Sequence, residues 1–146
     1  MGLSRRADGD VSDTFQYRFD ETRWPLVIIP SPGGMDPESI DQDSFYAEFH
    51  RFSEKGERVF FIHDLRGVQR MDAGRRRRFV QWAKLHSPTA RKLIVGYAVL
   101  IDSKLMSGVV TAVLWFMRPP CPMKVFSNAA DAEAWLFSLD KEQRAI

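Results

Sequence analysis

Apolar residues along this chain occur in short runs with strand-like spacing and in longer stretches with helical spacing. Phe15, Tyr17 and Phe19 alternate with polar residues, which is typical of a half-buried strand. The polar segment 20–23 would turn the chain into a second strand, and 59–62 is an unbroken apolar run that indicates burial on both faces of a sheet. The predicted strands are 15–19, 24–29, 59–62, 93–101 and 123–126.

Stretches with helical spacing separate most of these strands. The first carries an apolar stripe, and Gly56 behind it suits the left-handed residue that ends a helix. The stripe consists of Phe45, Tyr46, Phe49 and Phe52. The predicted helices are 39–55, 72–86 with Asp72 as its cap, 103–117 with Asp102 or Ser103 as its cap, and a last one that Ser127 would cap.

The resulting order, β-β-α-β-α-β-α-β-α, predicts an α/β fold. We expect a single mixed, mostly parallel sheet of about five strands with about four helices. The 146 residues suit one domain, which we expect to span 14–146 behind a flexible polar segment, 1–13.

Charge and cysteine content narrow the functional classes. The formal net charge is +2, so a general polyelectrolyte role is excluded and any basic function must be local. The single cysteine, Cys121, leaves no internal disulfide framework and fits a reducing compartment. The N-terminal residues lack the apolar core of a signal peptide, so a cytoplasmic protein is expected.

Segment 93–117 has about the length of a membrane span. Asp102 and Lys104 would lie in its middle, where charges are expensive. A strand followed by a buried helix explains the segment better, and no membrane span is predicted.

Residues with catalytic or metal-binding chemistry form no recognisable constellation. His63 and Asp64 are adjacent on a predicted strand, where neighbouring side chains point to opposite faces, so they would not form a dyad. The three histidines lack metal-ligand spacing, and Cys121 has no histidine near it in the sequence. We therefore expect neither an enzyme nor a cofactor.

A polar loop and a basic helix start follow the strand that ends at His63. Such a loop lies at the end of a strand where α/β folds usually bind ligands. Consecutive guanidinium groups at a helix start oppose the positive end of the helix dipole, which favours an anionic site such as an acidic protein surface. The predicted partner-binding residues are Asp64, Arg66, Arg70, Asp72, Arg75, Arg76, Arg77 and Arg78. The alternative is a solvated face balanced by nearby acids. Nucleic acid is not expected, because the chain lacks a reading motif and is nearly neutral overall.

The predicted helix 103–117 is apolar around nearly its whole circumference. Such a helix is either buried on all sides or presents an apolar face to a partner. The predicted self-association residues are Val109, Val113, Trp115 and Phe116, which favours a homo-oligomer. The alternative is deeper burial under neighbouring loops.

Two stretches of the chain, 63–74 and 125–136, carry a family resemblance. The order of elements and the strand that runs through an Asp-Gly-rich loop into a helix resemble the STAS fold of anti-sigma-factor antagonists and of sulphate-transporter cytoplasmic domains. The C-terminal stretch is similar to the related branch that includes CRAL-TRIO lipid-binding domains. The resemblance implies a bacterial regulatory or scaffolding domain that acts through protein–protein interaction.

The chain departs from the phospho-regulated antagonists at one position. Where the resemblance implies a Ser or Thr acceptor at the helix start, this chain has Ala73, and no hydroxyl occurs between Met71 and Arg78. We therefore expect a non-catalytic STAS-like module without that phosphorylation switch. The alternative is a small-ligand or lipid-binding module with an apolar pocket, partly lined by the aromatic stripe.

Overall fold

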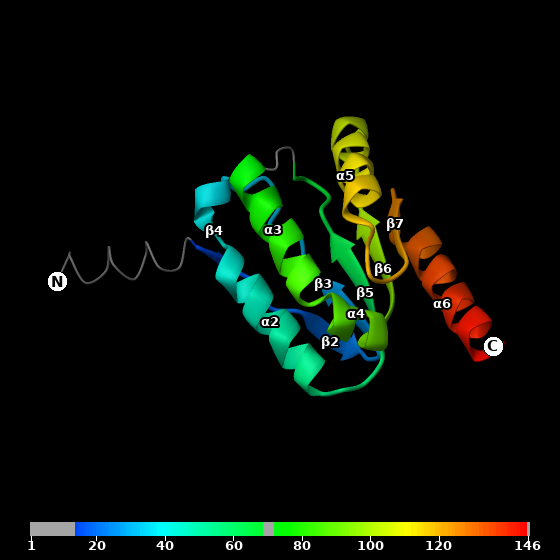
Figure 1. Ribbon diagram of the computed structural model, residues 1–146. Helices are drawn as coiled ribbons and strands as arrows, with labels where there is room; N and C mark the ends of the chain where they lie inside the picture. The colour runs from blue at the N-terminus through cyan, green and yellow to red at the C-terminus, as the bar shows by residue number, and fades with distance from the viewer. Residues whose placement is uncertain (1–13, 69–71, 146) are drawn as a thin grey trace.

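The computed structural model describes residues 14–68 and 72–145, and its centre is a five-stranded mixed sheet (Figure 1). The strand order is β2-β3-β5-β6-β7, with β2 and β3 antiparallel and the other neighbours parallel. The strands are β2 (Asp20–Arg23), β3 (Leu26–Ile29), β5 (Val59–Asp64), β6 (Ile94–Leu100) and β7 (Met123–Phe126). The predicted mixed, mostly parallel sheet is confirmed.

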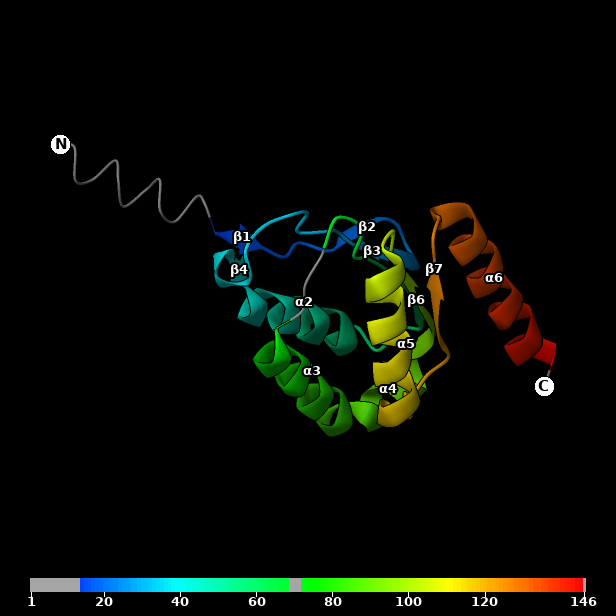
Figure 2. The ribbon, with the colours of Figure 1, turned by 90° about the horizontal axis from the view of Figure 1, so that it is seen from above.

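Helices cover both faces of this sheet, as Figure 2 shows from above. One face carries α2 (Gln42–Glu54), α3 (Ala73–Leu85), α4 (Ser87–Leu93) and α5 (Lys104–Met117), and the other carries α6 (Ala129–Ala145). The short helix α4 was not predicted, because the predicted helix 72–86 stops just before Ser87 and Pro88, and a proline usually follows the end of a helix. Pro88 lies in the first turn of α4, where a residue without an N–H does not interrupt the hydrogen bonding.

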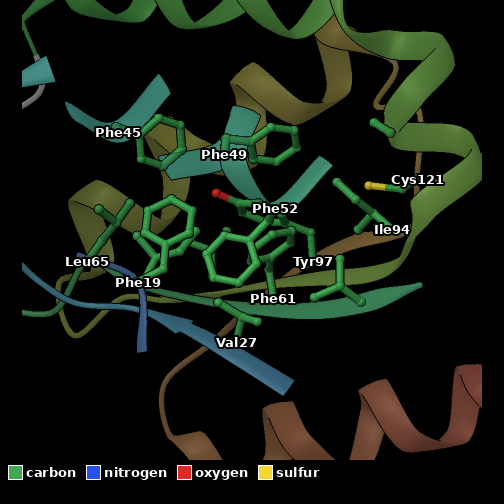
Figure 3. Packing of buried hydrophobic residues seen from close by; sticks show 14 of the residues in the cluster. Phe19, Val27, Phe45, Phe49, Phe52, Phe61, Leu65, Ile94, Tyr97 and Cys121 are labelled. Carbon is green, nitrogen blue, oxygen red and sulfur yellow. The ribbon is translucent and has the colours of Figure 1, made fainter. Parts of the chain in front are cut away.

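Two apolar clusters fill the space between these layers. Under α2 the cluster is aromatic (Figure 3). Phe45 makes edge-on contacts with Tyr17 and Phe19, and Phe52 with Phe61 of β5, at centroid distances of 5.4 to 6.4 Å. Under α6 the cluster is smaller and includes the fully buried Leu136. Strand β5 contributes to both clusters, so the predicted burial of both its faces is confirmed.

The predicted positions of the first strand and of the hairpin turn were wrong. Asp20–Arg23 is strand β2 itself, and the chain turns at Trp24–Pro25, which has a cis peptide bond. Before it, β1 (Phe15–Gln16) pairs in parallel with β4 (Ile40–Asp41) in a separate two-stranded sheet. A 3-10 turn, η1 (Pro37–Ser39), precedes β4.

The alternating residues before β2 nevertheless lie as their spacing predicted. Tyr17 and Phe19 are buried against α2. Their backbone N–H groups donate to α2 side chains, Tyr17 to Ser44 Oγ at 2.8 Å and Phe19 to Glu48 Oε1 at 2.9 Å. The apolar alternation therefore indicated burial correctly, but α2 side chains rather than a neighbouring strand satisfy the backbone.

Helix termini follow the predicted caps at two of three sites. Asp72 accepts the Gly74 N–H at 2.9 Å to start α3, and Ser103 accepts the Met106 N–H at 3.3 Å to start α5. For α6 the prediction was wrong by one residue, because Asn128, not Ser127, accepts the Asp131 N–H at 2.9 Å. No helix among the described residues is long and apolar enough to cross a membrane.

Candidate functional site

The predicted partner-binding residues do not form one patch. Asp64 lies at the end of β5 and binds Arg66 through two parallel hydrogen bonds of 3.0 Å each. Burial raises the pKa of Asp64, but the hydrogen bonds from Arg66 outweigh it and lower that pKa overall. This pair shapes the loop after β5. Arg70 lies outside the described residues.

Arg75, the first of the four consecutive arginines, points into the molecule. Its guanidinium donates to the backbone oxygens of Pro37 and Ile40 and to Gln42 Oε1, and its side chain is 23% exposed. Asp72 lies 3.7 Å from its Nε. Arg75 thus connects α3 to the η1–β4 segment and is not free to bind a partner.

The other three arginines diverge around the helix. Arg78 pairs with Asp43 of α2 at 2.7 Å and lies over the Tyr46 ring. Arg77 is exposed and Arg76 is half-buried, and neither pairs with an acid within the described parts of the chain. Because successive helical residues are about 100° apart, this spread follows from helix geometry.

The predicted self-association residues divide between a groove and open solvent. Trp115 and Phe116 are 83% and 92% exposed, so α5 is not covered by neighbouring loops. Val109 and Val113 are half-buried and line a shallow groove between α5 and α3. Leu105 on α5 and Leu85 on α3 are also exposed, at 75% and 76%.

This groove brings the two predicted residue sets together. Its α3 side is lined by Arg76, Val80 and Lys84, and its α5 side by apolar residues that include Val113 and Phe116. Neither α3 nor α5 contains an Asp or Glu. We call the whole exposed surface of these two helices, which includes the groove and also Leu85, Leu105, Arg77 and Trp115, the α3/α5 face.

A cavity of about 480 Å³ lies behind α3 and α5, at the carboxyl ends of β3 and β5. The loop after β3 and the loop after β5 form one side of it, and α2, α3 and α5 form the others. This is the sheet edge where the sequence predicted a binding site. Arg76 and Val113 line both this cavity and the groove.

Three polar rings lie among the mostly apolar walls of the cavity. His63 Nδ1 lies 2.6 Å from the hydroxyl of Tyr97, and Phe45 stacks on the imidazole at a centroid distance of 5.5 Å. Burial lowers the pKa of His63 to about 4, against a smaller opposing effect of Asp64. Burial also raises the pKa of Tyr17 to about 12, and it raises that of Tyr97 well above its usual value. All three rings are therefore neutral near pH 7.

Sequence reasoning considered His63 only as a partner of Asp64 and missed the cavity rings. Asp64 turns to Arg66 while His63 faces the helices, which confirms that the two form no dyad. A signal was present, because His63 follows Val59 and Phe61 at the two-residue period of one strand face. A histidine on such a face has to find a buried hydrogen-bond partner. No cluster of three potential metal ligands occurs within residues 14–68 and 72–145.

Comparison with protein families agrees with this architecture. Residues 30–137 match the SpoIIAA-like family model. This range includes strands β5, β6 and β7 and all the residues of the groove. The chain belongs to the SpoIIAA-like family. This family has the STAS-like fold of anti-sigma-factor antagonists, so the resemblance seen in the sequence is confirmed. SpoIIAA-like domains are typically regulatory protein-interaction domains. No curated protein and no solved structure matches the chain significantly.

Proposed function

We propose that this SpoIIAA-like chain is a non-catalytic regulatory or scaffolding module of the cytoplasm that binds an acidic surface of a protein partner through the α3/α5 face. The observation that carries this proposal is the combination of exposed Trp115 and Phe116 with basic residues on two helices that contain no acid. Monomeric proteins rarely leave large contiguous apolar groups in water, and such groups mark contact sites.

The composition of the face fits the way protein interfaces work. Aromatic and arginine side chains dominate binding energy at the centres of interfaces. Trp115 and Phe116 would provide the apolar anchor, and Arg76 and Arg77 would provide charge complementarity to the partner. Arg75 and Arg78, which already have partners, are outside the proposed contact.

The start of α3 supports regulation by binding rather than by phosphorylation at that position. Asp72 caps the helix through the Gly74 N–H, and Ala73 offers no hydroxyl to modify. The proposed module would therefore be controlled by the availability of its partner.

Self-association is the competing use of the same face. In a two-fold dimer each residue meets its counterpart region, so Arg76 and Arg77 of two copies would approach one another. This repulsion favours an acidic partner over a second copy, although the sequence alone favoured a homo-oligomer.

Site-specific photo-crosslinking in the source cells tests the proposal. Phe116 is replaced by p-benzoylphenylalanine, and the matched control carries the same group at Phe137 of α6, which is 44% exposed. The proposal expects a discrete heteromeric adduct from position 116, lost in Arg76→Glu/Arg77→Glu and kept in Lys124→Glu/Lys141→Glu. An adduct at twice the chain mass would replace the acidic partner by a second copy. If the adduct still forms in Arg76→Glu/Arg77→Glu, these arginines do not contribute to partner binding and only keep the surface soluble.

A further inference from the structure

The cavity contains one buried polar atom without a hydrogen-bond partner. His63 Nε2 is closed off from solvent and makes no hydrogen bond to any described residue, and it is the one such side-chain atom found in the described parts of the chain. Buried polar groups are normally paired, so an orphaned atom on a ring that lines a cavity indicates a missing ligand atom.

The hydrogen bond on the other side of the ring determines what Nε2 can do. The Tyr97 hydroxyl lies 2.6 Å from His63 Nδ1, and the imidazole is neutral, with one proton to place. If Tyr97 donates to Nδ1, the imidazole proton is on Nε2 and one donor remains unpaired. The opposite arrangement would leave both the Tyr97 proton and Nε2 without partners. The first arrangement is therefore favoured, and Nε2–H is a donor that requires an acceptor.

The size of the cavity and the polarity of its walls indicate the size and polarity of the ligand. Its volume of about 480 Å³ is within the range of small-molecule sites. A single water could satisfy Nε2, but that volume has room for on the order of fifteen waters at about 30 Å³ each, and they would face mostly apolar walls. Phe45, Phe79 and Val110 are among the apolar groups on the walls.

We propose that this cavity binds a small apolar molecule with one oxygen acceptor, a carbonyl or a carboxylate, which accepts the Nε2–H of His63. The positively charged Arg75 and Arg76 and the negatively charged Asp36 and Asp72 line the same cavity, so its walls do not strongly select an anion over a neutral acceptor. The site lies on the sheet side of α3 and α5 and shares Arg76 and Val113 with the α3/α5 face, but probe binding and photo-crosslinking test the two proposals separately.

Three naphthalene probes of matched size test this assignment on the full chain by isothermal titration calorimetry. They are 2-acetylnaphthalene with a neutral carbonyl, 2-naphthoate with a carboxylate, and 2-ethylnaphthalene without an acceptor. We expect one or both oxygen-bearing probes to bind about tenfold more tightly than the hydrocarbon, because it leaves Nε2–H unpaired. The stronger of the two identifies the acceptor as carbonyl or carboxylate.

Two further measurements connect the preference to His63. In long-range ¹H–¹⁵N spectra, the oxygen-bearing probe should shift the Nε2 resonance of His63, and the hydrocarbon should not. In His63→Phe the preference for oxygen should disappear, and in the matched control His50→Gln, an exposed residue of α2, it should remain. Equal affinity for all three probes, or a preference that survives in His63→Phe, would overturn the role of His63. Absence of binding by every probe at millimolar concentration would overturn the binding site.

Discussion

The stability of this protein should fall between pH 7 and pH 5 because His63 cannot easily take up a proton in the folded state. Burial lowers the pKa of His63 from 6.5 to about 4. As the pH falls through 6.5, the unfolded chain binds a proton at this position while the folded chain does not. The neutral histidine thus contributes stability that is fully present above pH 6.5 and is lost as the pH falls towards 4.

The magnitude follows from the two pKa values. The full difference corresponds to about 3 kcal/mol, of which about 2 kcal/mol would be lost between pH 7 and pH 5. Asp64 and Glu48 have lowered pKa values, so their contributions disappear only below the ordinary values of 3.8 and 4.5. Measurements at pH 5 and above therefore isolate the histidine.

Urea denaturation at half-unit pH steps from 7 to 5 measures this loss. Wild type should lose about 2 kcal/mol of unfolding free energy, and His63→Phe should lose much less, whatever its absolute stability. His50→Gln removes an exposed histidine and should keep the wild-type slope, since its pairing with Glu54 is a surface interaction. Parallel pH profiles for wild type and His63→Phe would refute the reasoning.

Three other substitutions or modifications follow from single contacts. Gly96→Ala should lower the free energy of unfolding by about 1–3 kcal/mol in urea titrations, because its Cβ would lie 2.7 Å from Leu139 Cδ1 of α6; an unchanged midpoint would show that α6 shifts freely. Arg75→Met should cost about 1–3 kcal/mol by removing its bonds to the η1–β4 segment, whereas the exposed Arg77→Met should change stability by less than about 0.5 kcal/mol; equal effects would contradict the inward role of Arg75. The buried thiol of Cys121, whose pKa burial raises to about 12, should react with iodoacetamide at pH 8 at least about 100-fold more slowly in the folded protein than in urea, and comparable rates would exclude its burial.

The parts of the fold that sequence predicted are those determined by local pattern. The apolar run at 59–62 identified the central strand, because a strand buried on both faces has no polar alternation. Asp72 and Ser103 identified two helix starts, because a short polar side chain at that place captures a free backbone N–H. Both signals act within a few residues.

The errors arose where residues that are distant in the sequence determine the local structure. Tyr17 and Phe19 alternate like a sheet strand, but Ser44 and Glu48, more than 25 positions away, satisfy their backbone N–H groups. This leaves Asp20–Arg23 to form the hairpin strand instead. Period-two alternation reports burial and not hydrogen-bond partners, so the sequence could not distinguish these outcomes.

The four arginines show a similar limit. Helix geometry predicts from the sequence that their side chains diverge. It does not predict that Arg75 would find backbone oxygens of the η1–β4 segment, or that Arg78 would find Asp43 of α2, because both partners come from other elements. Only Arg76 and Arg77 remain for a partner. The run of four arginines therefore suggested twice as many partner-binding residues as the structure leaves unpaired.

The cavity was the feature least accessible from sequence. Phe45, Phe79 and Val110 have the spacing of core residues, and they do lie on the inner faces of their helices. Inward-facing side chains fill the space above the sheet only if α3 and α5 lie close enough to it. The spacing of apolar residues along one helix gives no information on that distance. A polar ring in an apolar strand is the available clue, because a closely packed core has no reason to retain an unpaired His63 Nε2. A volume of about 480 Å³ with an orphaned donor at its wall is better explained by a ligand than by imperfect packing, because water filling it would meet mostly apolar walls.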